Sequence, residues 1–535
     1  MFREIYRKLN YLRLRAINEN KRNLNHNNSS DTNRPIPKSI DKIKSSLQNV
    51  FSDCADVIIR EFALGESSQV KFIIAFVEGL VEKEVISTHV LKSLMTEVKK
   101  VDLNKRITSH GMVKILKENL LSACEVNETK NYLETIHAIL SGNTVLYIDG
   151  NDTAIIIDTK GWEQRGIEEP DTESVVRGPR EGFSETLRNN TALLRRKIKN
   201  PNLKFEVFRL GEQTQTDICI CYIKGIARED IIDTVKRRIN NINTDAILES
   251  GYIEEFIEDA PLSIFPTVGN SEKPDVVAAK LLEGRVAILC DGTPFVLTVP
   301  YLFMESLQAS EDYYARPIFS SIVRLLRLLA LAITTFLPAF YVALVAFHQN
   351  VIPFKLLLTI ASSREGIPFS PFMEALLMGI IFELLREAGV RMPRPIGQAI
   401  SIVGALVLGE ASVEAGLVSD LMVIITAITA ITSFVLPPLG GTVPMIRIAL
   451  LIGANVLGLV GLGLIAVVFI IHLCTIRSFG VPYMSPFSPL SKEELKDSVI
   501  RVPIWEMLTR PRLLTQNNTM HNKYRMKINF RKKED

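Results

Sequence analysis

Residues Leu421–Ile446 read LMVIITAITAITSFVLPPLGGTVPMI, a run of 26 residues without a charged side chain. Two similar runs belong to the same region, Leu328–Phe347 with 20 residues and Ile448–Ile476 with 29. Only 15 of the 156 residues from Phe319 to Cys474 are charged, against 106 of the other 379. Because about 20 apolar residues cross the hydrocarbon core as a helix, we expect an all-α transmembrane bundle of about 4–5 helices over residues 317–480.

Acidic residues interrupt this apolar region. The segment PFMEALLMGIIFELLREAGVRMP (Pro371–Pro393) is predicted to be helical, and it carries several charges. A carboxylate in lipid is costly, so these groups should face water, each other or the bundle interior. Either the helix is amphipathic and lies at the membrane interface, or it lines a polar cavity or pore. With two acids from the next apolar run, the candidate pore or intramembrane polar residues are Glu374, Glu383, Arg386, Glu387, Glu410 and Glu414.

The last apolar run is rich in glycine. Gly453, Gly458, Gly461 and Gly463 are predicted to line one final crossing, whereas the small residues Gly404, Gly409, Ala411 and Gly416 of the preceding region are predicted to allow close helix packing. Basic ends flank this run, at Arg447 and Arg477. If both ends of the chain are cytoplasmic, one segment of the bundle must turn back, and the sequence leaves open which one.

The region before the bundle contains an internal duplication. FIIAFVEGLVEKEVI (Phe72–Ile86) aligns without gaps on ICICYIKGIAREDII (Ile218–Ile232), and LSGNTVLYIDG (Leu140–Gly150) aligns on LEGRVAILCDG (Leu282–Gly292). In each copy an Asp-Gly pair stands between two β-rich runs, which predicts a tight hairpin. We therefore expect two tandem related α/β subdomains, at about residues 51–165 and 200–316.

A basic segment of about residues 166–199 connects the two copies. It includes RGPREGFSETLRNNTALLRRKIKNPNL (Arg177–Leu203), with no phosphate-binding glycine loop and no interleaved aromatic residues. A helix start beside arginines can bind an anion, whereas a protein contact or a solvated helix is the more conservative interpretation. The candidate residues for subunit contact or anion binding are Arg177, Arg180, Arg188, Arg195 and Arg196.

Composition favours neither an enzyme nor a metalloprotein. The seven histidines are scattered and the six cysteines fit a reducing compartment. Cys219 and Cys221 alternate in ICICYI, so both should face one side of a strand and pack as small apolar side chains. We expect no catalytic, metal or cofactor site and no nucleic-acid binding. Residues 1–50 are predicted to be a basic disordered tail and residues 481–535 a basic cytoplasmic tail. No secretory signal is evident, so the large N-terminal region should be cytoplasmic.

Several segments, in order, resemble a known family. They are GPREGF (Gly178–Phe183), LRNNTALLRR (Leu187–Arg196), EKPD…LLEGRVAILCDGTPFVLTVP (Glu272–Pro300), EDYY (Glu311–Tyr314), ELLREAGVRMP (Glu383–Pro393), SIVGALVLGEASVEAGLVS (Ser401–Ser419) and SFGVPY (Ser478–Tyr483). Together they resemble the A subunit of GerA-type spore germination receptors over about Asp53 to Pro489. Two positions depart from the family pattern: Lys273, where arginine is usual, and Asp420, where proline often follows Val-Ser.

This resemblance implies a nutrient (germinant) receptor subunit in the spore inner membrane that triggers germination. It implies a transporter-like B subunit and a lipoprotein C subunit as partners. It also implies a homo-oligomer, with a pentamer as the expected number, that forms a ligand-gated cation channel. The residues themselves show only carboxylates within an apolar bundle. They leave open a secondary transporter, for which we would expect an inverted repeat, and a non-conducting scaffold or signal-coupling subunit.

Overall fold

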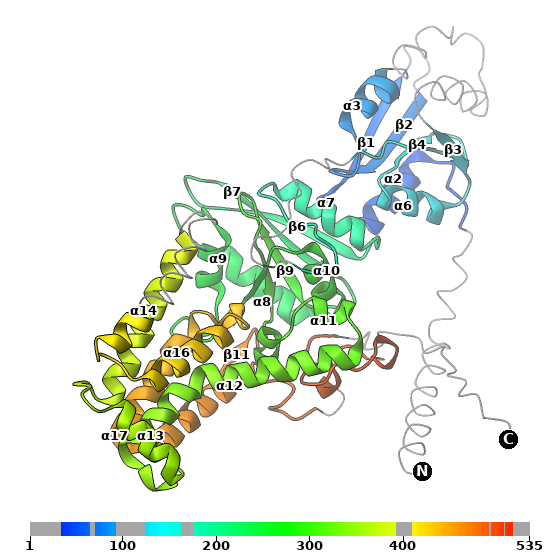
Figure 1. Ribbon diagram of the computed structural model, residues 1–535. Coiled ribbons are helices and arrows are strands. Elements are labelled where there is room, and N and C mark those ends of the chain that lie inside the picture. Colours follow the sequence, from blue (N-terminus) through cyan, green and yellow to red (C-terminus); the bar gives the residue numbers. More distant parts are fainter. Residues whose placement is uncertain are drawn as a thin grey trace, which may run out of the picture.

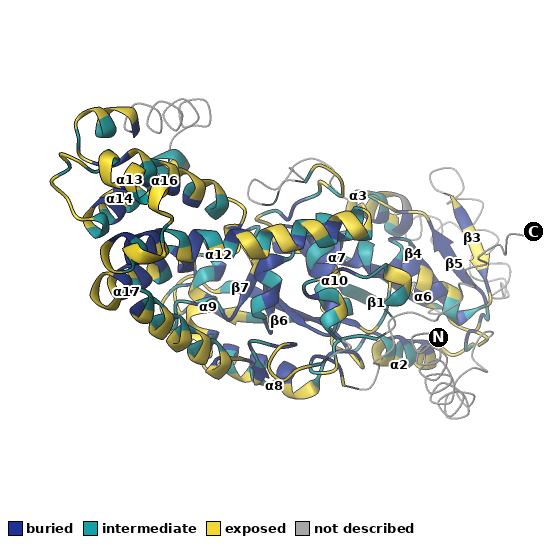
Figure 2. Ribbon diagram, turned by 60° about the horizontal axis from the view of Figure 1, so that its bottom comes forward, coloured by how far each residue is buried: buried dark blue, intermediate teal, exposed yellow. Residues whose placement is uncertain are grey.

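The computed structural model of the chain describes residues 34–64, 70–92, 125–161, 173, 175–391, 409–491, 494–507 and 509–516. Two α/β repeats are followed by a helical bundle and by a C-terminal segment that returns to the second repeat (Figure 1). Figure 2 shows the strands buried and the outer faces of the bundle helices exposed. This arrangement confirms the predicted fold class, a duplicated α/β region followed by apolar helices.

The first repeat is an antiparallel five-stranded sheet, in the order β1-β2-β4-β5-β3, with helices on both faces. Alternate residues of β2 point to opposite faces, so Ile73 packs toward α2 and α6 whereas Ile74 packs toward Ile86 of the turn after α3. The elements are α2 (Ile40–Val50), β1 (Val57–Leu64), β2 (Val70–Val77), α3 (Lys83–Val85), η2 (Ile86–Leu91), β3 (Val126–Thr129), α6 (Tyr132–Leu140), β4 (Thr144–Ile148) and β5 (Ala154–Ile157).

The second repeat has the same topology, in the order β6-β7-β9-β10-β8. Cys219 and Cys221 of β7 lie on one face, toward α7 and α10, and both are fully buried, as their alternation predicts. The opposite face carries Ile218 and Ile220 toward α8 and α9. The elements are α7 (Leu187–Lys197), β6 (Leu203–Leu210), β7 (Thr216–Ile223), α8 (Glu229–Asn240), α9 (Ser250–Ile257), β8 (Gly269–Ser271), α10 (Pro274–Leu282), β9 (Val286–Cys290) and β10 (Val296–Val299).

The two Asp-Gly turns show how closely the repeats correspond. Asp149 accepts a hydrogen bond from Ile40 N (3.1 Å) at the start of α2, and Asp291 accepts one from Leu187 N (2.9 Å) at the start of α7. Gly150 and Gly292 follow them with φ of 78° and 91°, values that glycine adopts without a Cβ penalty. Each hairpin therefore caps the helix that opens its own repeat.

The repeats begin one helix earlier than the sequence predicted. α2 lies within the predicted disordered tail of residues 1–50, yet Ile40, Ile43 and Leu47 are in the core of the first repeat. α7 lies within the predicted connecting segment of residues 166–199 and is the counterpart of α2. Both helices carry many polar and charged residues. For that reason the sequence did not indicate that their few apolar side chains belong to the cores of the repeats. Residues 1–33 of the predicted tail lie outside the described residues.

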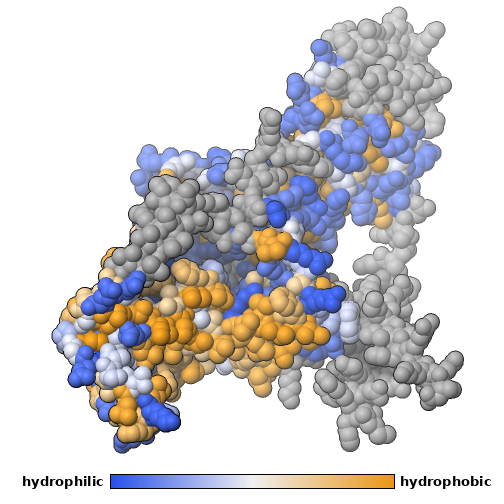
Figure 3. Space-filling model, in the orientation of Figure 1, coloured by the Kyte–Doolittle hydropathy of each residue, from blue (hydrophilic) through white to orange (hydrophobic). Residues whose placement is uncertain are grey.

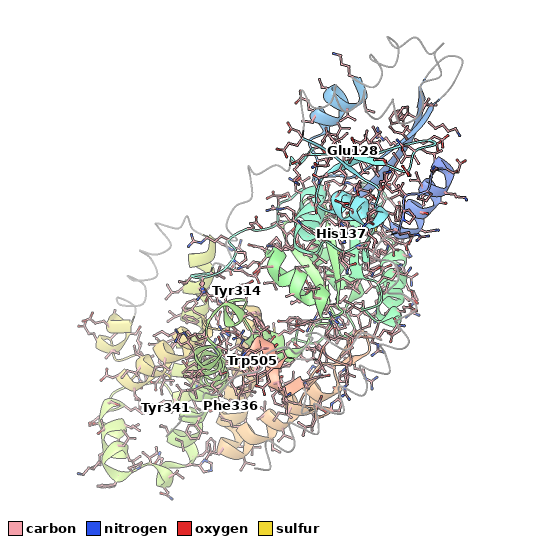
Figure 4. The ribbon with its side chains drawn as sticks, turned by 90° about the vertical axis from the view of Figure 1, so that its right-hand side faces the viewer. Glu128, His137, Tyr314, Phe336, Tyr341 and Trp505 are labelled. Atoms are coloured by element: carbon pink, nitrogen blue, oxygen red, sulfur yellow. The ribbon has the colours of Figure 1, made fainter. Side chains whose placement is uncertain are left out.

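The bundle follows a short connection made of η3 (Phe303–Leu307) and α11 (Glu311–Tyr314). Figure 4 shows Tyr314 between the repeats, where Glu128 and His137 are labelled, and the bundle, where Phe336 and Tyr341 are labelled. The bundle elements are α12 (Pro317–Phe347), η4 (Gln349–Val351), α13 (Phe354–Ser363), α14 (Pro371–Arg391), α16 (Asp420–Ser433), η5 (Pro437–Leu439) and α17 (Thr442–Thr475). The bundle surface seen in Figure 3 is mostly apolar, with some hydrophilic patches toward the lower left.

Two of the described helices, α12 and α17, are long and apolar enough to cross a membrane. The predicted number of about 4–5 crossings is therefore not confirmed.

Helix α17 is not one crossing, because the chain reverses at Gly458. Its backbone there has φ 61° and ψ −137°, outside the helical region. A Cβ added to Gly461 would lie 2.1 Å from the carbonyl oxygen of Gly453. Eight residues of a continuous helix would separate those positions by about 12 Å, so the two halves of α17 must run side by side. The glycines that were predicted to line one crossing instead form a helical hairpin.

Both ends of this hairpin contact the second repeat. Thr442 Oγ1 donates to the carbonyl oxygen of Ile264 (2.6 Å), and His472 Nε2 lies 3.0 Å from Ser263 Oγ. The tip lies beside the end of α12, where a Cβ on Gly458 would meet His348 at 2.7 Å. The hairpin thus enters and leaves the bundle on the side of the α/β repeats.

The chain then returns to the repeats through the small hairpin β11 (Arg477–Ser478) and β12 (Val481–Pro482). It continues through η6 (Glu494–Asp497) and η7 (Ile504–Glu506), and Leu514 is fully buried in the core of the second repeat. The described part of the predicted cytoplasmic tail is therefore packed, whereas residues 517–535 lie outside the described residues.

Candidate functional site in the helical bundle

Glu374 is the most deeply buried carboxylate of the bundle. It lies in the first turn of α14 and is fully buried. Its Oε1 is 2.9 Å from Arg364 Nη1, and its Oε2 accepts from Ser419 N (3.0 Å) and Ser419 Oγ (2.9 Å). Ser419 is the residue before α16, so the carboxylate also lies at the positive end of that helix. Glu374 therefore ties α14 to the start of α16.

Glu383 forms a second network at the base of the α17 hairpin. Its Oε1 accepts from Arg447 Nη2 (2.7 Å), and its Oε2 pairs with Arg386 Nη2 (2.7 Å). Arg386 also donates through Nη1 to the carbonyl oxygen of Gly440 (3.1 Å). Arg447 is the most buried of the three charged side chains, 8% exposed, so its charge is compensated inside the bundle. This network joins α14 to α17.

The other three predicted acids lie on the surface of the bundle. Glu387 pairs with Arg391 (2.6 Å), with side chains 61% and 78% exposed. Glu410 and Glu414 lie on the helical turn of residues 409–414, and both are exposed.

The structure brings together only part of the predicted set. Glu383 and Arg386 pair, as their spacing of three residues predicted, whereas Glu387 turns to Arg391 instead. Glu374 lies apart from them, consistent with its position about half a turn away around α14. A role for any of these residues in conduction stays a prediction.

Sequence reasoning missed the partners of Glu374 and Glu383, which are Arg364, Ser419 and Arg447. Each partner comes from a different element, and spacing along one helix carries no information about contacts between helices. The available signal was charge balance, because a buried carboxylate needs a cation and the apolar region contains few.

One arginine of the basic segment between the repeats, Arg195, is fully buried. Arg195 donates through Nε and Nη2 to the carboxylate of Asp56 (2.8 and 2.9 Å) and through Nη1 to the carbonyl oxygen of Asn200 (3.0 Å). Its guanidinium lies 4.8 Å from the ring centre of Phe205. Asp56 precedes β1 and Phe205 belongs to β6, so Arg195 joins the two repeats.

The remaining arginines of this segment lie near carboxylates or backbone groups. Arg188 Nε is 3.6 Å from Glu78, and Arg196 donates to Glu181 at 3.2 Å. The backbone N–H of Arg177 donates to Glu311, 3.4 Å away. Arg180 lies in the extended stretch before α7. The geometry of Arg188, Arg195 and Arg196 favours intramolecular pairing, and anion binding by the segment stays a prediction.

Lys273, one of the two positions expected to depart from the family pattern, is buried at the start of α10. Its Nζ is 4.0 Å from Asp275 Oδ2 and, like Asp275 Oδ1, has no hydrogen-bond partner in the described part of the chain. Tyr314 donates to Asp275 from the connection to α12. This ion pair is therefore a long one, with a buried donor and a buried acceptor left unsatisfied among the described residues.

Several titratable side chains lie around the C-terminal end of α10. Burial lowers the pKa of Lys280, although Glu305 lies 3.4 Å from its Nζ. Burial raises the pKa of Glu283, while Arg285 at 3.4 Å opposes that shift. Among the described residues, no group of three or more His, Cys, Asp or Glu side chains is arranged to hold a metal ion.

Known proteins are similar to this chain over most of its length. A family model described as Bacillus/Clostridium GerA spore germination protein matches residues 45–513. Spore germination protein KA of Bacillus subtilis (strain 168) is 44% identical over 485 residues, which cover 90% of this chain and 88% of that protein. Spore germination protein GerLA of Bacillus cereus is 39% identical over 487 residues, covering 90% and 97%.

Two further matches extend this comparison. The uncharacterized membrane protein YfkQ of Bacillus subtilis (strain 168) is 44% identical over 487 residues, covering 91% of this chain and 93% of that protein. Among solved structures, the N-terminal domain of the A subunit of the Bacillus megaterium spore germinant receptor GerK3 is 32% identical. That match covers 51% of this chain and 98% of the solved chain, with a TM-score of 0.41.

Proposed function

The chain belongs to the GerA family of spore germination proteins, and on that premise we propose that it is the A subunit of a nutrient receptor and forms an oligomeric, ligand-gated cation channel. The proposed site of action is the spore inner membrane, with the α/β repeats in the cytoplasm. The proposed partners are a transporter-like B subunit, a lipoprotein C subunit and further copies of this chain, with five as the expected number.

The observation that carries the channel proposal is the exposure of acidic residues on an apolar bundle. Glu387, Glu410 and Glu414 are exposed, although the described helices of the bundle are mostly apolar. Carboxylates facing lipid are costly, so other protein or water must cover them in the membrane. A ring of subunits would place such residues around a shared aqueous path, where carboxylates attract cations.

The two carboxylates that join α14 to neighbouring helices have a different role in this proposal. Glu374 and Glu383 are each compensated by an arginine, at 2.9 Å and 2.7 Å, so neither offers a free charge to a passing ion. They fix the packing of α14 against α16 and α17. Glu387 is also paired, with Arg391 at 2.6 Å, but that pair is exposed to solvent. The candidates for lining the path are therefore the three exposed acids, Glu387, Glu410 and Glu414.

Neutralisation tests this assignment. Glu387→Gln, Glu410→Gln and Glu414→Gln, singly and combined, should lower nutrient-triggered potassium release from spores and reduce selectivity for potassium over chloride in proteoliposomes. Glu255→Gln, at an exposed position of α9, is the matched control and should leave both unchanged. All variants are compared at equal protein level in the membrane.

Two outcomes would reject the channel proposal. Normal potassium release and selectivity in the triple variant would exclude these acids from the path. Absence of conductance from the wild-type complex, with nutrient response intact, would favour the non-conducting scaffold. A transporter would instead show saturation and coupling to an ion gradient.

A further inference from the structure

The first turns of α12 have one apolar face and one ionic face. Ile318, Ile322 and Leu326 are between 51% and 79% exposed, whereas Arg324 is only 2% exposed and is directed toward α11 and the C-terminal segment. On that inward face, ion pairs fix this part of the helix. We call the four side chains that form these pairs the junction cluster; they are Asp312, Arg324, Arg327 and Asp497.

Arg324 is the centre of the junction cluster because it holds two carboxylates from different segments. Its Nε donates to Asp312 Oδ2 at 2.9 Å. Its Nη1 donates to Asp497 Oδ1 (2.9 Å), to the backbone oxygen of Asp497 (2.7 Å) and to the backbone oxygen of Ser498 (3.3 Å). Arg327 shares Asp312 through Nη1 at 2.8 Å. The planar guanidinium allows this simultaneous binding, which a lysine ammonium cannot reproduce.

The two carboxylates that bind Arg324 belong to two segments that are far apart in the sequence. Asp312 lies in α11, directly before α12. Asp497 lies in η6, and its Oδ2 accepts from Tyr313 at 2.8 Å. Further along the same segment, Arg501 N donates to Ser321 of α12 at 3.1 Å. The C-terminal segment therefore fastens two successive turns of α12.

The other end of the C-terminal segment is anchored in the second repeat. Arg510 donates to the carbonyl oxygen of Leu282 at the end of α10 (2.7 Å), and Arg228 beside α8 donates to that of Leu513 (2.9 Å). Leu514 is fully buried in the core, and Gln516 N donates to Ile226 (3.1 Å). One short stretch of chain thus connects the core of the second repeat to the first turns of a bundle helix.

We propose that Arg324 is a positioning residue that transmits movement of the second repeat to α12, through its simultaneous binding of Asp312 and Asp497. The attachment of α12 is argued from the junction cluster alone, whereas its effect on ion release rests on the proposed channel function. Arg324 Nη2 is already buried without a hydrogen-bond partner among the described residues, so the contacts through Nε and Nη1 compensate its charge. Losing either carboxylate would leave the buried charge less compensated, so the cluster favours discrete positions of α12 over a continuous range. In the arrangement of this structure the cluster is closed and α12 is held against the C-terminal segment.

The first test measures the attachment itself, independently of conduction. In the full chain in lipid nanodiscs, Asp497→Asn should speed hydrogen exchange in residues 317–327 and 494–502 by about tenfold or more. The milder variant Arg324→Lys, which keeps the charge but loses the double contact, should have a smaller effect in the same segments. Asp217→Asn is the matched control, because it breaks an exposed aspartate–arginine pair (2.9 Å) on the second repeat. Unchanged exchange in both junction variants would overturn the proposal.

The second test measures the consequence. In spores with equal receptor level, Asp497→Asn should lower the nutrient concentration that gives half-maximal potassium release, or cause release without nutrient. A purely structural role would change the amount of receptor and not this concentration. If exchange rises in the variant while the dose dependence stays that of wild type, transmission through Arg324 is refuted. If the wild-type complex conducts nothing, the channel function fails, and the exchange result still decides whether the attachment exists.

Discussion

Arg195 shows why a basic motif can serve structure. Four basic residues lie within Arg188–Lys197, a pattern that suggests an anion site. One of them, Arg195, is instead buried against Asp56 of the other repeat. The pair is bidentate and both side chains are at most 2% exposed. Geometry of this kind can compensate the desolvation of both charges, which a single long contact could not.

Breaking this pair should loosen the joint between the repeats. Asp56→Asn is expected to destabilise the chain by about 3 kcal/mol, because it leaves the Arg195 guanidinium buried without its counter-charge. Thermal unfolding of the full chain in detergent should show a lower midpoint. Breaking the exposed Arg209–Asp217 pair by Arg209→Gln is the control, with an expected change of at most about 1 kcal/mol. Equal shifts in both variants would contradict a special role for the buried pair.

Lys273→Arg makes the opposite prediction, a gain in stability. Lys273 Nζ and Asp275 Oδ1 are both buried and without hydrogen-bond partners in the described chain. A guanidinium reaches further and offers more donors, so it should satisfy Asp275 and add about 1 kcal/mol. The measurement is the unfolding midpoint, expected to rise by about 2–4 °C. Lys273→Met, which leaves Asp275 without a counter-charge, should lower it, and a stabilising methionine would show that the charge has no role.

Glu254 provides a pH-dependent prediction. Burial, with repulsion from Glu258 and Glu249, raises the pKa of Glu254 to about 7. The folded state then holds its proton more tightly than the unfolded state, so this residue reduces stability as pH rises from about 5 to 8. Glu254→Gln should therefore raise the unfolding midpoint at pH 8, by the equivalent of about 1 kcal/mol, and leave it nearly unchanged at pH 5. An equal gain at both pH values would contradict this origin.

At the scale of single elements, the sequence was informative where periodicity and turn chemistry agreed. The aligned glycines Gly79 and Gly225 have φ of 87° and 82°, so the alignment of the two copies identified equivalent positions. The Asp-Gly hairpins were also predicted correctly. Helices α2 and α7 were missed as the first elements of each repeat because their apolar residues are few. Their burial depends on strands far along the chain, which no local pattern records.

The α17 hairpin shows the same limit in the apolar region. Hydropathy measures length and composition, and both are satisfied by a continuous helix of 34 residues. The reversal depends on the φ of Gly458 and on the close approach of Gly453 and Gly461, which hydropathy does not measure. Small residues in an apolar run therefore predict close packing, and the structure is needed to identify the neighbour as the other half of the same element.

Substitution at the turn tests this interpretation. Gly458→Ala would place a Cβ at positive φ and within 2.9 Å of both Phe347 and His348. It is expected to destabilise the bundle by about 2–3 kcal/mol. The readout is the thermal midpoint of the full chain in detergent. Gly463→Ala, where a Cβ meets nothing within 4 Å, is the control and should be neutral or stabilising. Equal tolerance of both substitutions would argue for a continuous helix.

At the scale of the whole molecule, the second repeat supports the bundle at three places. It contacts both ends of the α17 hairpin, at Ile264 and Ser263. It also holds the C-terminal segment through Leu514. These contacts come from chain segments separated by 178 residues or more, so their meeting could not be inferred from the sequence. A soluble region attached in this way can transmit movement to several bundle helices at once.

The hairpin makes one prediction about the orientation of the complete chain. Cys474 lies near one end of α17 and is exposed, whereas His348 lies beside the hairpin tip. If α17 turns back, residue 474 lies on the side of the α/β repeats, and residue 348 lies toward the opposite side. In vesicles of known orientation, a membrane-impermeant thiol reagent should label Cys474 from the side that also exposes the repeats to protease. A cysteine introduced by His348→Cys in a Cys474→Ser background should react from the other side. A continuous α17 would instead place residue 442 and Cys474 on opposite sides of the membrane. Thr442→Cys in the same background therefore distinguishes the two arrangements. Labelling of this cysteine from the side of the repeats supports the hairpin, and labelling from the far side refutes it.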